Sequence, residues 1–80
     1  MNEIPITFEF EGKNYSGFFN QVSGAGSSAM FHLMINNFYW GRLRFSDFAN
    51  DWVFDGNKPG IEKLAGEFGY CVTAWLDSHY

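Results

Sequence analysis

The spacing of apolar residues changes once along this chain of 80 residues, and that change constrains the fold more than any other feature. Before residue 55 the clearest run, residues 4–11, has apolar residues at every second position, which is typical of strands with one buried face. After residue 60 they recur every three or four residues, which is typical of a helix. The segment between, Asp55-Gly56-Asn57-Lys58-Pro59-Gly60, is rich in turn residues. The sequence therefore predicts a sheet followed by one C-terminal helix.

The first alternating run predicts a strand that continues into a tight hairpin. Its apolar members are Ile4, Ile6, Phe8 and Phe10. A two-residue turn at Gly12-Lys13 would place glycine at the first central position, as a type II′ turn requires. This turn predicts a register in which Phe10 faces Tyr15, Phe8 faces Gly17 and Ile6 faces Phe19.

The segment 36–45 forms a second predicted hairpin with a strand over about 29–36. If its turn were only Asn36-Asn37, Arg42 would lie opposite Phe31 on the buried face, and an unpaired buried charge is costly. We therefore expect a three-residue loop, Asn36-Asn37-Phe38, with asparagine in the left-handed position. The expected register pairs Leu33 with Gly41 and Phe31 with Leu43 in the core. On the reverse face it pairs Met34 with Trp40, His32 with Arg42 and Met30 with Arg44.

The rest of the region before the helix predicts loops and one short strand. The Gly- and Ser-rich stretch 23–28 predicts a loop, and its Gly24-Ala25-Gly26 lacks the lysine and the helix start of a phosphate-binding loop. A polar connection and a short fifth strand follow later, with Trp52 and Phe54 facing inward.

The C-terminal segment predicts one amphipathic helix from about residue 59 or 60 to residue 78. Its apolar stripe on a helical wheel consists of Ile61, Leu64, Ala65, Phe68, Val72, Trp75 and Leu76. Asn57 is the expected N-terminal cap, and Glu62 lies near the positive end of the helix dipole. Gly69 lies at the edge of the stripe, where a missing side chain lets the helix approach the sheet closely.

Together these elements predict a single small α+β domain over residues 1–80. The expected architecture is a five-stranded antiparallel meander sheet, strongly curled toward a half-open barrel, with one C-terminal amphipathic helix packed on one face. A chain of this length buries only about 60% of its unfolded surface, so the core must be dense. Aromatic residues make up 21% of the sequence and supply that density.

The sequence offers little for catalysis or metal binding. Its only cysteine is Cys71, its histidines are His32 and His79, and none of them has metal-ligand spacing. Cys71 lies on the flank of the helical stripe, where a buried cysteine acts as a small hydrophobic residue. Asp47 and Asp51 come nearest to a catalytic carboxylate pair, but acids in loops commonly serve only to interact with water. We expect no enzyme activity, no cofactor and no metal ion.

Charge and cysteine content argue against several partners and compartments. The formal net charge is −4, which argues against nucleic-acid binding, since that draws on clustered Lys and Arg. No apolar run approaches the ~18 residues of a membrane span, and the N-terminal residues lack the pattern of a signal peptide. A single cysteine cannot form an intramolecular disulfide, which is typical of a reducing compartment. We expect a cytoplasmic protein without membrane contact.

One set of residues on the reverse face of the predicted sheet suggests a partner. It combines aromatic, methionine and cationic side chains, several of which are enriched at interface centres. Its members are Phe18, Met30, His32, Met34, Trp40, Arg42 and Arg44. In a purely structural interpretation, sheet curvature or the 46–51 loop covers part of this face and the arginine stems lie over Trp40. In the functional one the face is an interface, because one helix covers only one side of a five-stranded sheet.

Three classes of function remain open. We expect first a non-catalytic protein-interaction module that self-associates as a dimer, through this Trp/Met/Arg face or through an edge of its sheet. Binding of another protein would use the same surfaces. The alternative is a small-ligand or carbohydrate binder with Trp40 or Trp52 as a stacking platform. An enzyme is the third class, for which the sequence provides no polar constellation.

Overall fold

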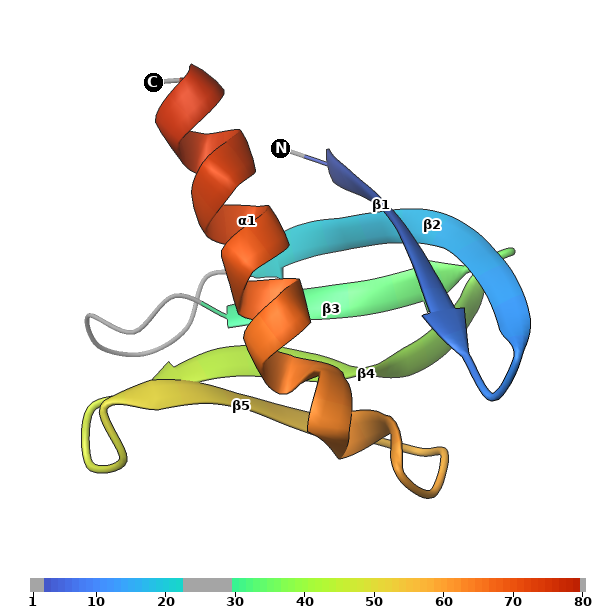
Figure 1. Ribbon diagram of the computed structural model, residues 1–80. Coiled ribbons are helices and arrows are strands. Elements are labelled where there is room, and N and C mark those ends of the chain that lie inside the picture. Colours follow the sequence, from blue (N-terminus) through green and yellow to red (C-terminus); the bar gives the residue numbers. More distant parts are fainter. Residues whose placement is uncertain (1–2, 23–29, 80) are drawn as a thin grey trace.

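The computed structural model describes residues 3–22 and 30–79, which form a sheet and a C-terminal helix (Figure 1). The strands are β1 (Glu3–Phe10), β2 (Lys13–Val22), β3 (Met30–Ile35), β4 (Phe38–Ser46) and β5 (Asp51–Gly56). A 3-10 turn, η1 (Ile61–Leu64), leads into α1 (Ala65–His79). The strand order is β1-β2-β3-β4-β5 and each neighbouring pair is antiparallel, so the predicted five-stranded meander is confirmed.

The sheet is curled into a half-barrel, and α1 lies along its inner face (Figure 1). The alternation in β1 contributes to this arrangement, because its apolar side chains all point to the buried face while the residues between them are exposed. The core also holds Phe19, Phe31, Leu33, Leu43, Phe54 and Phe68. No polar or charged residue is buried among the described residues, so the hydrophobic effect is the main force that joins helix and sheet. The predicted α+β class is confirmed.

The β1–β2 hairpin has the predicted faces but not the predicted turn. Its turn residues are Glu11 and Gly12, with φ values of 53° and 78°, as in a type I′ turn. Ile6 therefore pairs with Gly17 rather than with Phe19. The prediction of a Gly12-Lys13 turn was wrong because it required glycine at the first central position, whereas Glu11 adopts the left-handed conformation there. Each pairing moves by two residues, so every side chain keeps its predicted face.

The β3–β4 hairpin closes with a two-residue turn rather than with the predicted three-residue loop. Asn36 and Asn37 form this turn, and both have left-handed φ values, 51° and 69°. Asparagine tolerates this conformation at both central positions of a type I′ turn. The prediction was wrong because it assumed a regular ladder, in which a two-residue turn places Arg42 on the buried face. In the structure a β-bulge in β4 shifts the register, and Arg42 pairs with His32 on the outer face.

That bulge lies at Trp40 in β4, where the ladder with β3 shifts its register. Tyr39, not Trp40, pairs with Met34, while Leu33 still pairs with Gly41 as predicted. The Trp40 side chain turns to the helix side of the sheet, where it is 7% exposed and belongs to the core. The prediction of Trp40 on the reverse face was therefore wrong, because an extra residue in a strand inverts the alternation of its side chains.

The C-terminal helix has the predicted apolar stripe and a different start. Its stripe residues are all buried or partly buried against the core. Helical structure begins as η1 at Ile61 with Gly60 as the N-terminal cap, so the prediction of Asn57 as the cap was wrong. Asn57 instead holds the bulge. Its backbone N–H donates to the carbonyl oxygen of Trp40 (3.1 Å) and its side-chain Nδ2 donates to that of Tyr39 (2.8 Å).

The remaining predicted segments have different outcomes. β5 turns its aromatic residues inward as predicted, since Phe54 is buried and Trp52 packs against the core. The predicted loop at 23–28, with its Gly24-Ala25-Gly26, lies outside the described residues. No helix in the described part of the chain is long and apolar enough to cross a membrane.

Candidate interaction surfaces

The structure brings all the predicted interface residues except Trp40 onto the outer face of the sheet, opposite α1. They lie in cross-strand rows, in which Phe18 pairs with Met34, His32 with Arg42 and Met30 with Arg44. Phe18 is 45% exposed, and the others are partly buried. No described element covers this outer face.

Tyr39 is an outer-face residue that sequence reasoning missed. The bulge gives it the position opposite Met34 that was predicted for Trp40, and it is 45% exposed. Its ring meets that of His32 edge to face, with 5.1 Å between the ring centroids. The Asn-Asn pair was the sequence signal that could have located it, since such pairs favour two-residue type I′ turns.

The charged side chains of the outer face form a small ion-pair cluster around Asp55. Arg42 Nη2 lies 3.7 Å and Arg44 Nε 3.3 Å from Asp55 Oδ2, and the three side chains are between 37% and 52% exposed. Solvent screens such pairs, which contribute about 0–1 kcal/mol each. The predicted packing of the arginine stems over Trp40 was wrong, because Trp40 lies on the other face.

Two polar atoms of the outer face lack a partner within the described residues. Asn20 Oδ1 and Arg42 Nε are both enclosed, and neither makes a hydrogen bond there. The two residues flank His32 in one cross-strand row. A partner on this face could satisfy both atoms, which keeps the predicted interface open as a hypothesis.

The free edge of β1 is a second candidate surface. β1 is the first strand of the sheet order, so it has a neighbour, β2, on one side only. Phe10 and Lys13 flank the two-residue turn as a hydrogen-bonded pair. Hydrogen-bonded pairs alternate along an antiparallel ladder, so the backbone N–H and C=O groups of Phe10, Phe8 and Ile6 point to β2. The N–H and C=O groups of the residues between, Thr7 and Glu9 among them, therefore point outward. Pro5 fits this edge. An N–H group at position 5 would point away from β2 and have no partner in the sheet, so proline loses no hydrogen bond there.

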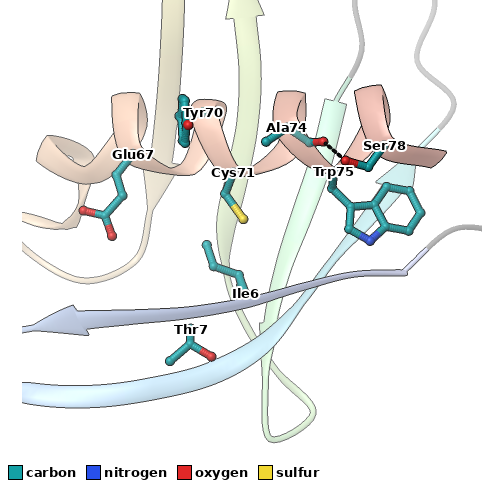
Figure 2. Close-up of a pocket in the computed structure, with 8 residues that line it drawn as sticks. All are labelled: Ile6, Thr7, Glu67, Tyr70, Cys71, Ala74, Trp75 and Ser78. Atoms are coloured by element: carbon teal, nitrogen blue, oxygen red, sulfur yellow. Dashed lines mark hydrogen bonds between the residues drawn. The ribbon is translucent and has the colours of Figure 1, made fainter. Parts of the chain in front are cut away.

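An open groove lies between this edge and α1 (Figure 2). Its volume is about 460 Å³. Ile6 and Thr7 line it from β1, and the helical wall consists of Glu67, Tyr70, Cys71, Ala74, Trp75 and Ser78. Sequence reasoning missed this groove, although proline inside an alternating run was a signal for an edge strand.

Cys71 points from α1 toward β1 in this groove (Figure 2). Its Sγ lies 3.9 Å from the carbonyl oxygen of Pro5, at the distance of a weak hydrogen bond. Burial raises the pKa of the Cys71 thiol, and the negative charge of Glu67 raises it further. The thiol therefore stays protonated at neutral pH, whereas a nucleophilic cysteine requires a lowered pKa.

The potential metal ligands and the Asp47–Asp51 pair are the remaining residues that the sequence singled out. In residues 3–22 and 30–79, no group of three or more His, Cys, Asp or Glu side chains could hold a metal ion. Asp51 accepts a hydrogen bond from the backbone N–H of Trp52 (2.8 Å), and Asp47 is exposed.

Comparisons of the chain with protein-family models, curated proteins and solved structures find no match.

Proposed function

We propose that the protein is a non-catalytic interaction module that forms a homodimer through the free edge of β1. The observation that carries this proposal is an open hydrogen-bonding edge, eight residues long, beside the groove under α1. Unpaired N–H and C=O groups on such an edge pair readily with another strand. A second copy of the chain is the partner that we propose, because two copies of this edge can pair with each other as antiparallel strands about a two-fold axis.

That register is centred on Thr7. Two antiparallel β1 strands related by a two-fold axis at this residue place it opposite Thr7 of the second copy, and the two residues exchange N–H···O bonds. The N–H of each Glu9 then donates to the Pro5 carbonyl oxygen of the other copy. Pro5 has no backbone N–H. Each end of the dimer ladder therefore lacks one hydrogen bond, the one that would reach the carbonyl oxygen of Glu9.

Charge disfavours one of the neighbouring registers. An axis at Ile6 would place Glu3 directly opposite Glu9 of the second copy, and like charges opposite one another destabilise a strand pair. In the Thr7 register Glu9 lies opposite Pro5, and Glu3 meets only Glu11, which lies in the turn beyond the end of β1. The glutamates thus disfavour the Ile6 register, and the proline limits uncontrolled pairing at the edge.

The helical wall of the groove supplies the apolar contact that a strand ladder lacks. Both α1 helices would lie on the same face of the joined sheet, each presenting Tyr70 and Ala74 toward the two-fold axis. Tyr70 is 77% exposed in one copy, and tyrosine is enriched among residues that dominate binding energy. A standard interface buries about 800 Å² per partner, so the ladder and the helical wall must both take part.

The outer face supports self-association less well. It is the convex side of a curled sheet, so two copies would touch over a small area. Its central rows contain Arg42, Arg44 and Asp55, and the removal of such charges from water is costly. Contact through Phe18 and Tyr39 is the competing outcome of the tests below.

Two further parts of the proposal have separate support. The protonated thiol of Cys71 and the lack of a metal-binding cluster in the described residues support a non-catalytic role. A reducing, cytoplasmic location is supported by the single cysteine of the sequence, which excludes an intramolecular disulfide.

Substitution of Thr7 tests the proposal. The Thr7 N–H points away from β2, so Thr7→Pro removes a donor of the dimer ladder while the β1–β2 ladder stays intact. Thr7→Val is the matched control, because it keeps the N–H and a β-branched side chain. Light scattering should give the mass of a dimer for the wild type and for Thr7→Val, and of a monomer for Thr7→Pro.

Three results would overturn this assignment. The first is a wild-type protein that remains monomeric at millimolar concentration. The second is a Thr7→Pro variant that remains a dimer with an unchanged circular dichroism spectrum. The third is loss of the dimer in Phe18→Glu, whose side chain lies on the outer face. That loss would assign the interface to the outer face instead.

A further inference from the structure

A second cavity lies beside the β3–β4 turn and shares no lining residue with the groove under α1. Its volume is about 410 Å³, which is within the range of small-molecule sites. Its aromatic and aliphatic lining residues are Tyr15, Ile35, Phe38, Tyr39 and Trp40. Asn36, Asn57 and Lys58 supply its polar groups.

The aromatic wall of this cavity is fixed by ring packing. Trp40 meets Tyr15 edge to face, with 4.7 Å between ring centroids, and Tyr15 stacks on Phe8 at 5.7 Å. Phe38 lines the same cavity but is 72% exposed. Most of the apolar surface of the Phe38 ring is therefore in contact with water, and a ligand that packs against the ring would bury that surface, which is favourable.

Residues 57 and 58 place a positive charge at this wall. The two hydrogen bonds of Asn57 to the bulge anchor the chain there. The Nζ of the adjacent Lys58 lies over Trp40, 4.6 Å from the ring centroid, as in a cation–π contact. No ion pair in the described residues involves Lys58, and no acidic residue lines the cavity, although the sequence has nine.

We propose that this cavity binds a small ring compound that carries a carboxylate. The ring packs against Phe38 and Tyr15, and the carboxylate accepts a charge-assisted hydrogen bond from Lys58. A cationic ligand is disfavoured, because the Lys58 ammonium group already occupies the face of Trp40. An aromatic acid and a sugar acid share the required chemistry, since a sugar ring also has an apolar face. The proposal is independent of the dimer at β1.

An NMR titration of the full chain distinguishes an aromatic acid from a sugar acid as the ligand. The probes are benzoate and glucuronate, with benzyl alcohol and glucose as their neutral counterparts. We expect one of the acids to shift the amide signals of residues 36–40 and 57–58, and to bind at least about tenfold more tightly than its counterpart. The acid that binds more tightly shows whether the cavity prefers an aromatic ring or a sugar ring. Unchanged signals with both acids at tens of millimolar, or equal binding of the neutral compounds, would overturn the proposal.

Two lysine variants locate the charge that the ligand contacts. Lys58→Gln should weaken binding by about tenfold. Lys63→Gln removes the same charge from an exposed position in η1 and should leave the affinity unchanged. Phe38→Ala should also weaken binding without unfolding the chain, because Phe38 is mostly exposed. Equal effects of the two lysine variants would mean nonspecific charge attraction and would contradict the proposed site.

Discussion

Gly69 of α1 lies directly against the indole ring of Trp52 in β5. A methyl group at position 69 would overlap the Cγ, Cδ1 and Nε1 atoms of that ring, whereas a methyl group at Gly66 would meet nothing within 4 Å. The helix and the sheet are therefore as close at Gly69 as their atoms allow.

This contact predicts opposite effects for two chemically identical substitutions. Gly69→Ala should lower the free energy of unfolding by about 1–3 kcal/mol, because the helix must move away from Trp52. Gly66→Ala should raise it by about 0.5–1 kcal/mol, because alanine loses less conformational entropy in a helix. Urea denaturation of both variants measures the difference. Stabilisation by Gly69→Ala would show that the close contact is absent in solution.

Phe68 is the centre of the aromatic core. Its ring meets those of Phe8, Phe19 and Phe54 edge to face, with centroid distances of 5.1, 5.4 and 5.0 Å. Phe68→Ala should lower the free energy of unfolding by about 3–5 kcal/mol, through lost burial and a residual cavity. Phe48→Ala removes the same ring from a fully exposed position and should change stability little. A loss below ~1 kcal/mol for Phe68→Ala would mean that α1 packs through another face.

The raised pKa of the Cys71 thiol predicts how stability depends on pH. The folded chain holds the thiol proton to a higher pH than the unfolded chain, so it binds more protons once the unfolded thiol begins to ionise. The free energy of unfolding is therefore unaffected by this group at neutral pH and decreases as the pH rises through the folded pKa. Cys71→Ser should remove that alkaline decrease.

Alkylation by iodoacetamide measures the same shift independently, because the thiolate is the reactive form. Cys71 should react more slowly than a free thiol at mildly alkaline pH. Glu67→Gln should increase the rate, since it removes the second cause of the raised pKa. A rate as fast as that of a free thiol would contradict the shift.

The parts of the fold that the sequence predicted correctly depend on patterns within single elements. The alternation in β1 and the stripe in α1 each specify a buried face through the period of the backbone, regardless of how the elements meet. The close approach at Gly69 was also predictable, because its position at the edge of the stripe follows from the helical period alone.

The placement of Trp40 could not be predicted in this way, because its cause lies far along the chain. The bulge that turns Trp40 into the core is held by Asn57, whose hydrogen bonds reach the carbonyl oxygens of Tyr39 and Trp40. Gly41 is also required there, since a Cβ atom would lie 2.6 Å from the ring of Phe54 and 2.7 Å from the carbonyl oxygen of Asp55. A pattern within one strand contains none of these contacts.

The candidate surfaces were predictable only in part, for a related reason. The outer-face positions of Met30, His32, Arg42 and Arg44 follow from strand alternation, and they were predicted correctly. The groove requires knowledge of how α1 sits over the sheet, because residues of α1 and β1 line it together. In its helical wall, Tyr70 and Ala74 lie outside the apolar stripe and gave no sequence signal, although Trp75 belongs to the stripe.

An intermolecular NOE experiment tests the proposed β1 dimer most directly. In a mixed sample of isotope-labelled and unlabelled chains, the Thr7 register places Ile6 of one copy opposite Phe8 of the other in a non-hydrogen-bonded pair, where the Hα atoms approach closely. Within one strand these two residues are too far apart for such a contact. We predict a strong isotope-filtered NOE between the Hα atoms of Ile6 and Phe8. A dimer whose intermolecular NOEs connect Phe18, Met34 or Tyr39 instead, or a sample without any intermolecular NOE, would contradict the account.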